Sequence, residues 1–200
     1  KALNQVVCRL MAEIIEITQT IGKLRVLEVG AGTGATTASA LEGLNGNHAE
    51  YCFSDISLLF TRQAEERFRS QNGFSTRILD ISARPEEFDT LVGEFDIVIA
   101  ANVVHATESV QASLKNIQSL LAPGGVLVLL EAQPGQDWLE LVFGNITGWW
   151  SFSDDRLGRS TPLLNAPEWY EALKGAGFDR VKQVVGDGGT LIIANQTILL

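Results

Sequence analysis

The sequence predicts a doubly wound α/β fold, built on a mostly parallel seven-stranded sheet whose last strand is antiparallel. Three observations support this prediction. Short apolar segments alternate with segments of helical period along most of the chain. A glycine-rich turn follows the first apolar segment. Near the end, Asp187-Gly188-Gly189 is a tight-turn signal that joins two strands as a hairpin.

The expected elements follow one another in a regular order. An amphipathic helix comes first, because apolar residues recur at helical spacing from Leu3 to Ile17, and Gly22 ends it. The expected strands are 25–29, 51–54, 76–79, 95–101, 126–130, 180–185 and 190–194. The expected helices are 36–44, 58–70, a short piece at 85–91, 110–121, a short piece at 138–143, and 167–175. Residues 134–165 otherwise lack a clean period.

Composition limits the classes of protein to consider. A chain of 200 residues with 46% hydrophobic residues fits one globular domain. A net charge of −9 without a basic stripe argues against nucleic acid as a partner. No apolar run reaches the roughly 18 residues of a membrane helix, so we expect no membrane partner. The two cysteines, Cys8 and Cys52, lack metal-ligand spacing, so we expect reduced thiols, no bound metal and a cytoplasmic protein.

Both ends of the chain look cut. It begins at Lys1 without a methionine and ends on an apolar segment. We therefore interpret residues 1–200 as one domain excised from a larger polypeptide.

A candidate ligand site begins at the first strand, in the segment Glu28 to Gly34. Gly30 allows a sharp turn, and Gly32 allows a ligand to approach the backbone closely because it has no Cβ. The exposed amides at the start of the following helix attract an anionic group. Asp55 and Ile56 follow the second strand, where a carboxylate can accept hydrogen bonds from both hydroxyls of a ribose.

Two nucleotide cofactors fit this loop at first. Residues 30–35 satisfy a loose dinucleotide fingerprint. Three features favour S-adenosylmethionine and its product S-adenosylhomocysteine instead. Glu28 is suited to a cationic cofactor and would repel a pyrophosphate, and Gly34 completes a G-x-G-x-G pattern. At the expected end of the third strand, Asp80 can meet the adenine amino group and Ile81 can pack on the ring.

Further motifs, in their order along the chain, resemble the class I methyltransferases, whose fold is Rossmann-like. Residues 95–98 resemble their fourth strand, 121–127 the turn into their fifth, and the final hairpin their reversed seventh strand. The resemblance implies a core that binds S-adenosylmethionine. A nicotinamide-binding domain, or a glycine loop without a ligand, is the alternative.

A narrower resemblance starts at Asn102-Val103-Val104-His105-Ala106-Thr107 and continues with Glu131, Gly148-Trp149-Trp150 and Asp154-Asp155-Arg156. It is completed by Pro162-Leu163-Leu164, Trp169 and Ala176-Gly177-Phe178. Together these segments resemble the C-methyltransferase domains of polyketide synthases. The resemblance implies methylation of a β-ketoacyl chain carried on the phosphopantetheine arm of an acyl carrier protein, with neighbouring synthase domains as partners. That family adds an N-terminal helical lid, which is largely absent here.

The residues themselves are suited to this chemistry. The carbon between two carbonyls has an acidic proton, and an imidazole accepts protons near neutral pH. His105 is the candidate base, and Glu131 can fix its tautomer because both residues end adjacent predicted strands. Asn102 is expected to contact the cofactor through its backbone carbonyl.

Structural interpretations remain open at several of these positions. Glu28 can instead cap local backbone amides. Trp149 and Trp150 fit either a substrate tunnel or a core or domain interface, and His48 is assigned no function. A small-molecule O- or N-methyltransferase and a non-catalytic structural methyltransferase domain are the two functional alternatives.

Overall fold

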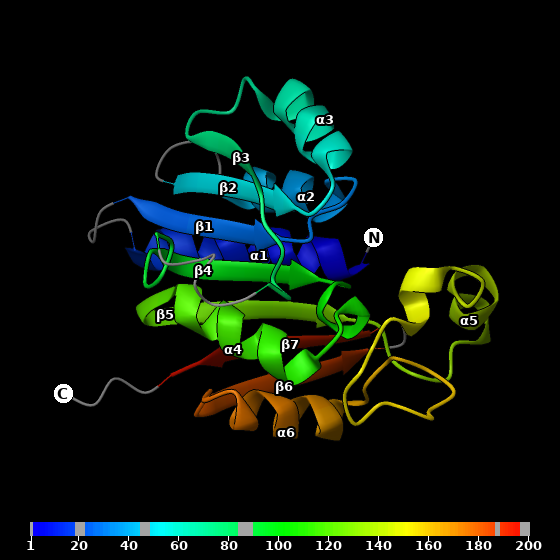
Figure 1. The fold of residues 1–200 in the computed structure, drawn as a ribbon. Coiled ribbons are helices and arrows are strands. Elements are labelled where there is room, and N and C mark those ends of the chain that lie inside the picture. Colours follow the sequence, from blue (N-terminus) through cyan, green and yellow to red (C-terminus); the bar gives the residue numbers. More distant parts are fainter. Residues whose placement is uncertain (1, 19–22, 45–48, 84–89, 187–188, 197–200) are drawn as a thin grey trace.

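A computed structural model describes residues 2–18, 23–44, 49–83, 90–186 and 189–196 of the chain. Its centre is a seven-stranded sheet with the strand order β3-β2-β1-β4-β5-β7-β6 (Figure 1). The strands are β1 (Leu24–Val29), β2 (Ala49–Asp55), β3 (Phe74–Ile78), β4 (Phe95–Ala101), β5 (Leu121–Glu131), β6 (Arg180–Gly186) and β7 (Gly189–Asn195). Pairing is parallel from β3 to β5, whereas β7 is antiparallel to both β5 and β6. The predicted fold class is confirmed.

Helices cover both faces of this sheet. The first face carries α1 (Ala2–Thr18), α2 (Ala35–Leu44) and α3 (Leu58–Phe68), and the other carries α4 (Val110–Leu120) and α6 (Ala166–Gly175). Alternation along β1 explains the two layers, because successive strand side chains point to opposite faces. Val26 belongs to the core cluster of Met11 in α1, and Leu27 belongs to that of Leu114 in α4.

The observed boundaries differ most from the predicted ones at β5. We expected this strand to begin at Val126, after residues 123–125 had ended the preceding helix. Instead α4 ends at Leu120, and β5 pairs with β4 from Leu121 onward, with a register shift between Phe95 and Ile97. Pro123, Gly124 and Gly125 therefore lie within β5, because a bulge accommodates extra residues in one strand of a pair.

The third strand also differs from its prediction. It ends at Ile78, so Asp80 and Ile81 follow the strand rather than ending it. The helical piece expected at 85–91 lies almost wholly outside the described residues, as do Gly22, His48 and residues 187–188. The hairpin itself is confirmed, because Gly186 pairs with Gly189.

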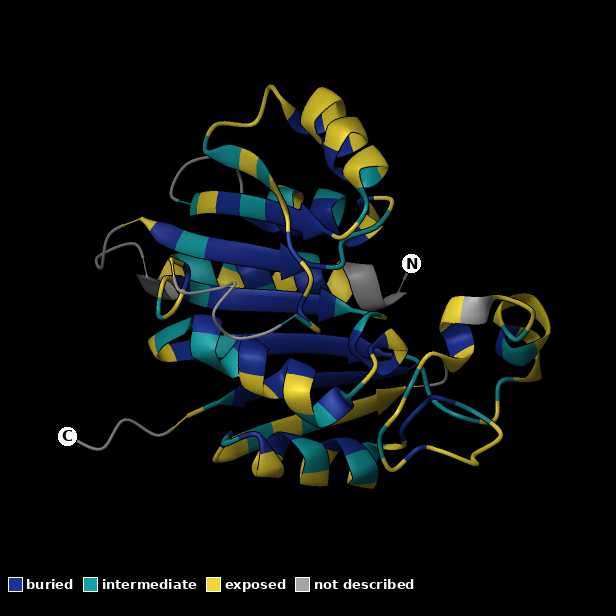
Figure 2. Cartoon of the chain, viewed as in Figure 1, coloured by how far each residue is buried: buried dark blue, intermediate teal, exposed yellow. Residues whose placement is uncertain are grey.

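Residues 132–165, which we name the lobe, lie beyond the carboxyl ends of the parallel strands (Figure 1). The lobe contains α5 (Asp137–Phe143) and a short 3₁₀ helix, η3 (Thr147–Trp150). Much of the lobe is exposed (Figure 2). Its exposed apolar residues include Trp138, Leu141 and Val142. No helix in the described ranges is long and apolar enough to span a bilayer.

Candidate active site

The glycine loop after β1 has backbone angles that other residue types adopt only with strain. Gly30, Gly32 and Gly34 have φ angles of 58°, 55° and 73°, in the left-handed region that favours glycine. A Cβ on Gly30 would lie 2.2 Å from Cγ2 of Val103, so the loop packs directly against the segment that follows β4. In the described part of the chain, a Cβ on Gly32 would meet only the Gly30 carbonyl oxygen, at 4.0 Å. Open space at Gly32 is therefore available to a ligand.

Asp55 at the end of β2 closes the other side of this loop. Its Oδ2 accepts a hydrogen bond from the Gly32 backbone amide at 2.8 Å, and its Oδ1 accepts one from the Ser57 amide at 2.8 Å. These two bonds fix the carboxylate next to the open side of Gly32. The next residue, Ile56, is 70% exposed and offers an apolar surface at the same edge of the sheet.

Glu28 is buried beneath the loop and bound by hydroxyl groups. Its Oε2 accepts hydrogen bonds from Thr37 Oγ1 at 2.5 Å and from the Tyr51 hydroxyl at 2.7 Å. Within the described residues its Oε1 is buried without a partner, and such an oxygen is suited to binding a cationic ligand. Burial raises the pKa of Glu28 to about 7, although the two hydroxyl bonds lower it. These contacts do not favour the backbone-capping interpretation.

Asp80 and Ile81 follow β3 but lie in different surroundings. Asp80 is exposed, and its Oδ1 accepts a hydrogen bond from the Ser82 amide at 2.8 Å. Ile81 is buried in the core cluster on the α4 side, and its carbonyl accepts a bond from Asn116 Nδ2 at 2.8 Å. Asp80 therefore remains available to an adenine amino group, whereas the more exposed Ile56 is better placed for an apolar ring contact.

His105 and Glu131 meet at the carboxyl ends of β4 and β5. His105 lies in a 3₁₀ turn, η2 (Val104–Ala106), and its Nδ1 is 2.5 Å from Oε2 of Glu131. The other oxygen of Glu131 accepts hydrogen bonds from the amides of Val103 at 3.2 Å and Val104 at 2.9 Å. Both side chains are buried. The carboxylate therefore holds both the imidazole ring and the backbone of the turn that carries it.

Asn102 precedes this turn in a strained conformation. It has a φ of 51°, and it is the one non-glycine residue with positive φ in the described part of the chain. Its backbone amide donates a hydrogen bond to the Leu130 carbonyl at 2.7 Å, and its side-chain Oδ1 accepts one from the Ala132 backbone amide at 3.0 Å. Such strain persists where surrounding contacts enforce it, and it is concentrated at functional sites.

A cavity of about 430 Å³ opens beside His105 and is formed mainly by the lobe. Its lining residues are Asn102, His105, Ala106, Ala132, Gln136, Trp138, Leu139, Phe143, Ile146, Gly148 and Trp149. Trp149 meets the His105 ring edge-on, with ring centroids 5.4 Å apart, and stacks on Phe143. Trp150 is 42% exposed and does not line the cavity. Of Trp149 and Trp150, therefore, Trp149 is the one that lines the cavity, together with Trp138.

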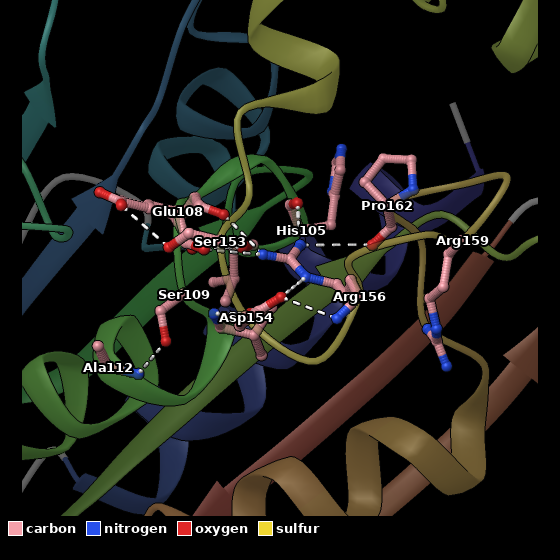
Figure 3. A network of polar contacts seen from close by, with 12 residues as sticks. His105, Glu108, Ser109, Ala112, Ser153, Asp154, Arg156, Arg159 and Pro162 are labelled. Atoms are coloured by element: carbon pink, nitrogen blue, oxygen red, sulfur yellow. Dashed lines mark hydrogen bonds and ion pairs between the residues drawn. The ribbon is translucent and has the colours of Figure 1, made fainter.

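Sequence reasoning gave no role to the ion pair of Arg156, which is buried, and Asp154, which is partly buried. Arg156 is 1% exposed, and its guanidinium binds Asp154 and backbone carbonyls of the His105 segment (Figure 3). The one available signal was the presence of both residues in the segment that resembled a known family.

Comparison with known proteins agrees with this architecture. Residues 27–127 match the family model described as "Methyltransferase domain". A highly reducing polyketide synthase, g433 from Fusarium sp., is 41% identical over 182 residues, which are 88% of this chain and 7% of the synthase. The crystal structure of the CurJ carbon methyltransferase has a TM-score of 0.87 and 39% identity over 96% of this chain and 53% of that one. The trans-methyltransferase CalH in complex with SAH has a TM-score of 0.83 and 34% identity over 98% of this chain and 58% of CalH.

The chain therefore belongs to the methyltransferase domain family, and its class I fold places it with enzymes that depend on S-adenosylmethionine. Within that family it is similar, over nearly all of its length, to carbon methyltransferase domains of polyketide synthases. It spans a small part of the synthases and about half of the solved methyltransferase chains.

Proposed function

We propose that this chain transfers a methyl group from S-adenosylmethionine to the α-carbon of a β-ketoacyl chain held as a thioester on an acyl carrier protein. The observation that carries the proposal is the 2.5 Å contact between His105 and Glu131 at the wall of an apolar cavity. The glycine loop packs against Val103, two residues before His105, so cofactor site and candidate base are adjacent.

The residues around the glycine loop fit the cofactor. Asp55 is suited to the ribose hydroxyls, Asp80 and Ile56 to the adenine, and the open side of Gly32 to close approach of the ligand. Glu28 and Asn102 are the candidates for the cationic amino-acid end. When bound, S-adenosylmethionine supplies an electrophilic methyl group, and S-adenosylhomocysteine is the product that leaves.

The proton chemistry follows from the hydrogen bond of His105. With a proton on Nδ1 directed at Glu131, the lone pair of the ring lies on Nε2. Nε2 takes the proton from the carbon between the two carbonyls, and the electron pair of that C–H bond forms the enolate. The enolate carbon would then form the new C–CH₃ bond as the S–CH₃ bond of the bound sulfonium breaks, and the electron pair of that bond would stay on sulfur. Glu131 stabilises the resulting imidazolium, because a buried carboxylate offsets a buried positive charge.

The cavity supports an acyl substrate rather than a charged one. Its lining is mainly aliphatic and aromatic, with Asn102 and Gln136 as polar groups besides His105. We propose that the lobe encloses the acyl chain while the two carbonyls face His105.

The relatives support a wider context. We propose that the chain is one domain of a larger multidomain synthase, where its partners are an acyl carrier protein and neighbouring domains. The free cysteines Cys8 and Cys52 support a cytoplasmic location, because such thiols persist in reducing compartments.

Mass spectrometry of a carrier-bound β-ketoacyl chain, incubated with the protein and S-adenosylmethionine, tests the proposal. We expect a mass gain of one methylene equivalent, placed on the α-carbon by fragmentation. A free phenol and a free amine serve as competing acceptors in parallel. Methylation of either acceptor in preference to the β-ketoacyl thioester would contradict the proposal.

A further inference from the structure

Arg156 is a fully buried cation that binds the backbone of the candidate base. Its Nη1 donates to the His105 carbonyl at 2.5 Å, and its Nη2 donates to the Thr107 carbonyl at 2.7 Å. Its Nε donates to Asp154 Oδ1 at 2.7 Å (Figure 3). One planar guanidinium thus connects the lobe to both ends of the short segment 105–107.

Asp154 completes this connection at the start of α4. Its Oδ2 accepts a hydrogen bond from the Val110 amide at 2.9 Å, and its Oδ1 also accepts one from the Arg156 amide at 3.2 Å. Burial alone would raise the pKa of Asp154, but the hydrogen bonds from Arg156 and Val110 outweigh it and lower the pKa. The carboxylate therefore stays ionised next to the buried guanidinium.

The turn that carries His105 needs such external support. A 3₁₀ turn of three residues has few hydrogen bonds of its own, and here they are Ala106 to Val103 and Thr107 to Val104. Glu131 fixes the ring at Nδ1. Arg156 binds the backbone carbonyl of His105, so His105 is held at both its side chain and its main chain.

We propose that Arg156, oriented by Asp154, is a positioning residue that sets the direction in which His105 presents its free ring nitrogen to the cavity. The inference rests on the proposed role of His105 as base. Burying an ion pair seldom adds stability compared with apolar residues, so a role in orientation accounts better for this pair. The bound carbonyls belong to His105 and to Thr107, two residues further along.

Two variants and a matched control test the inference. Arg156→Lys keeps the positive charge but lacks the planar fork that binds two carbonyls and Asp154 together. The double variant Arg156→Met with Asp154→Asn removes both charges, so no unpaired buried charge remains if the lysine variant folds poorly. Arg159→Met is the control, because Arg159 lies in the same segment and pairs with Glu168 of α6 instead of with the His105 segment.

We expect Arg156→Lys and the double variant to lower the methylation rate about tenfold to a hundredfold, because small misplacements of a catalytic group have effects of this size. Cofactor affinity should not change, and Arg159→Met should match the unmodified protein in rate. A full methylation rate in either Arg156 variant would overturn the inference.

Nuclear magnetic resonance of the imidazole protons reports on the hydrogen bond of the His105 ring. A residue that only stabilised the fold would leave this signal unchanged. The chain has two histidines, so the spectrum of His105→Ala assigns the Nδ1 proton shared with Glu131. We expect this signal to shift or vanish in Arg156→Lys and to persist in Arg159→Met. A lower rate with an unchanged imidazole signal would also overturn the inference. If His105→Ala itself methylates at the full rate, the proposed role of His105 as the base fails, while the spectra still decide whether Arg156 holds the ring.

Discussion

The proposed site has two halves, one for the cofactor and one for catalysis, and they differ in what holds them. The cofactor half, at the ends of β1 and β2, is shaped by backbone: three left-handed glycines and two amides that bind Asp55. The catalytic half, at the ends of β4 and β5, is shaped by buried charged side chains that bind amides and carbonyls. Each half also contains one buried glutamate. Glu28 has hydroxyl partners at one oxygen and, among the described residues, no partner at the other, whereas both oxygens of Glu131 are engaged.

This difference indicates a division between binding and reactivity. A backbone loop recognises a ligand by shape, and few substitutions there preserve the shape. Buried side chains can be exchanged one at a time, so the catalytic half can lose its chemistry while the cofactor half still binds.

The largest effect should follow from His105→Ala. We expect the methylation rate to fall about 10²- to 10⁴-fold, because that is the usual contribution of a general base. Cofactor affinity, measured by calorimetry, should stay unchanged if the halves are independent. Glu131→Gln should be impaired less, since an amide still orients the ring without stabilising its charge. A parallel loss of rate and cofactor affinity in His105→Ala would make His105 a binding residue and break the comparison.

Glu28 should make the stability of the fold depend on pH. The ordinary pKa of Glu28 is 4.5, and burial raises it to about 7 in the folded chain, so the folded state binds more protons between these values. The free energy of unfolding should therefore fall as the pH rises through this window, by about 3 kcal/mol from this group. Urea unfolding at several pH values compares the unmodified chain with Glu28→Gln, which should lack this part of the pH dependence. Identical pH profiles would show that folding does not raise the pKa of Glu28.

Asp55→Ala should weaken cofactor binding without removing His105 chemistry. Loss of a hydrogen bond to a charged group costs about 1.5–3 kcal/mol, or roughly tenfold to a hundredfold in affinity. Asp96→Ala is the matched control, because Asp96 also accepts a backbone amide bond, from Arg25, but near the start of β4. Calorimetry with S-adenosylhomocysteine should show a loss only for Asp55→Ala. Equal affinities in both variants would mean that another residue holds the ribose.

The smallest effect should come from Gly148→Ala in the cavity wall. A Cβ at Gly148 meets no atom of the described residues within 4 Å, so the variant should fold normally while the cavity narrows by one methyl group. One methyl group in an apolar pocket is worth about tenfold or somewhat more in specificity. We expect long β-ketoacyl chains to lose rate relative to short ones in a competition assay. A uniform change across chain lengths would place the acyl chain outside this cavity.

The cofactor half was accessible to sequence reasoning because its signals are local. Three glycines within five residues predict a loop geometry without knowledge of the rest of the chain. His105 and Glu131 are 26 residues apart, yet both follow strands, and parallel strands end at the same edge of a sheet.

The remaining contacts depend on packing that no short pattern contains. Arg156 lies in an aperiodic segment, 51 residues from the carbonyl that it binds. The Tyr51 hydroxyl reaches Glu28 only because β1 and β2 are neighbours in the final sheet. The end of β3 was misplaced because its pairing with β2, rather than its own residues, sets the boundary.

The lobe has a consequence for how such a domain can diversify. It is a single insertion between β5 and α6, outside every strand pairing of the sheet. Its length and lining can change without altering strand register, provided that the anchor at Arg156 is kept. Substitutions in this one loop can therefore change which methyl acceptor is bound, while the residues of the cofactor site stay the same.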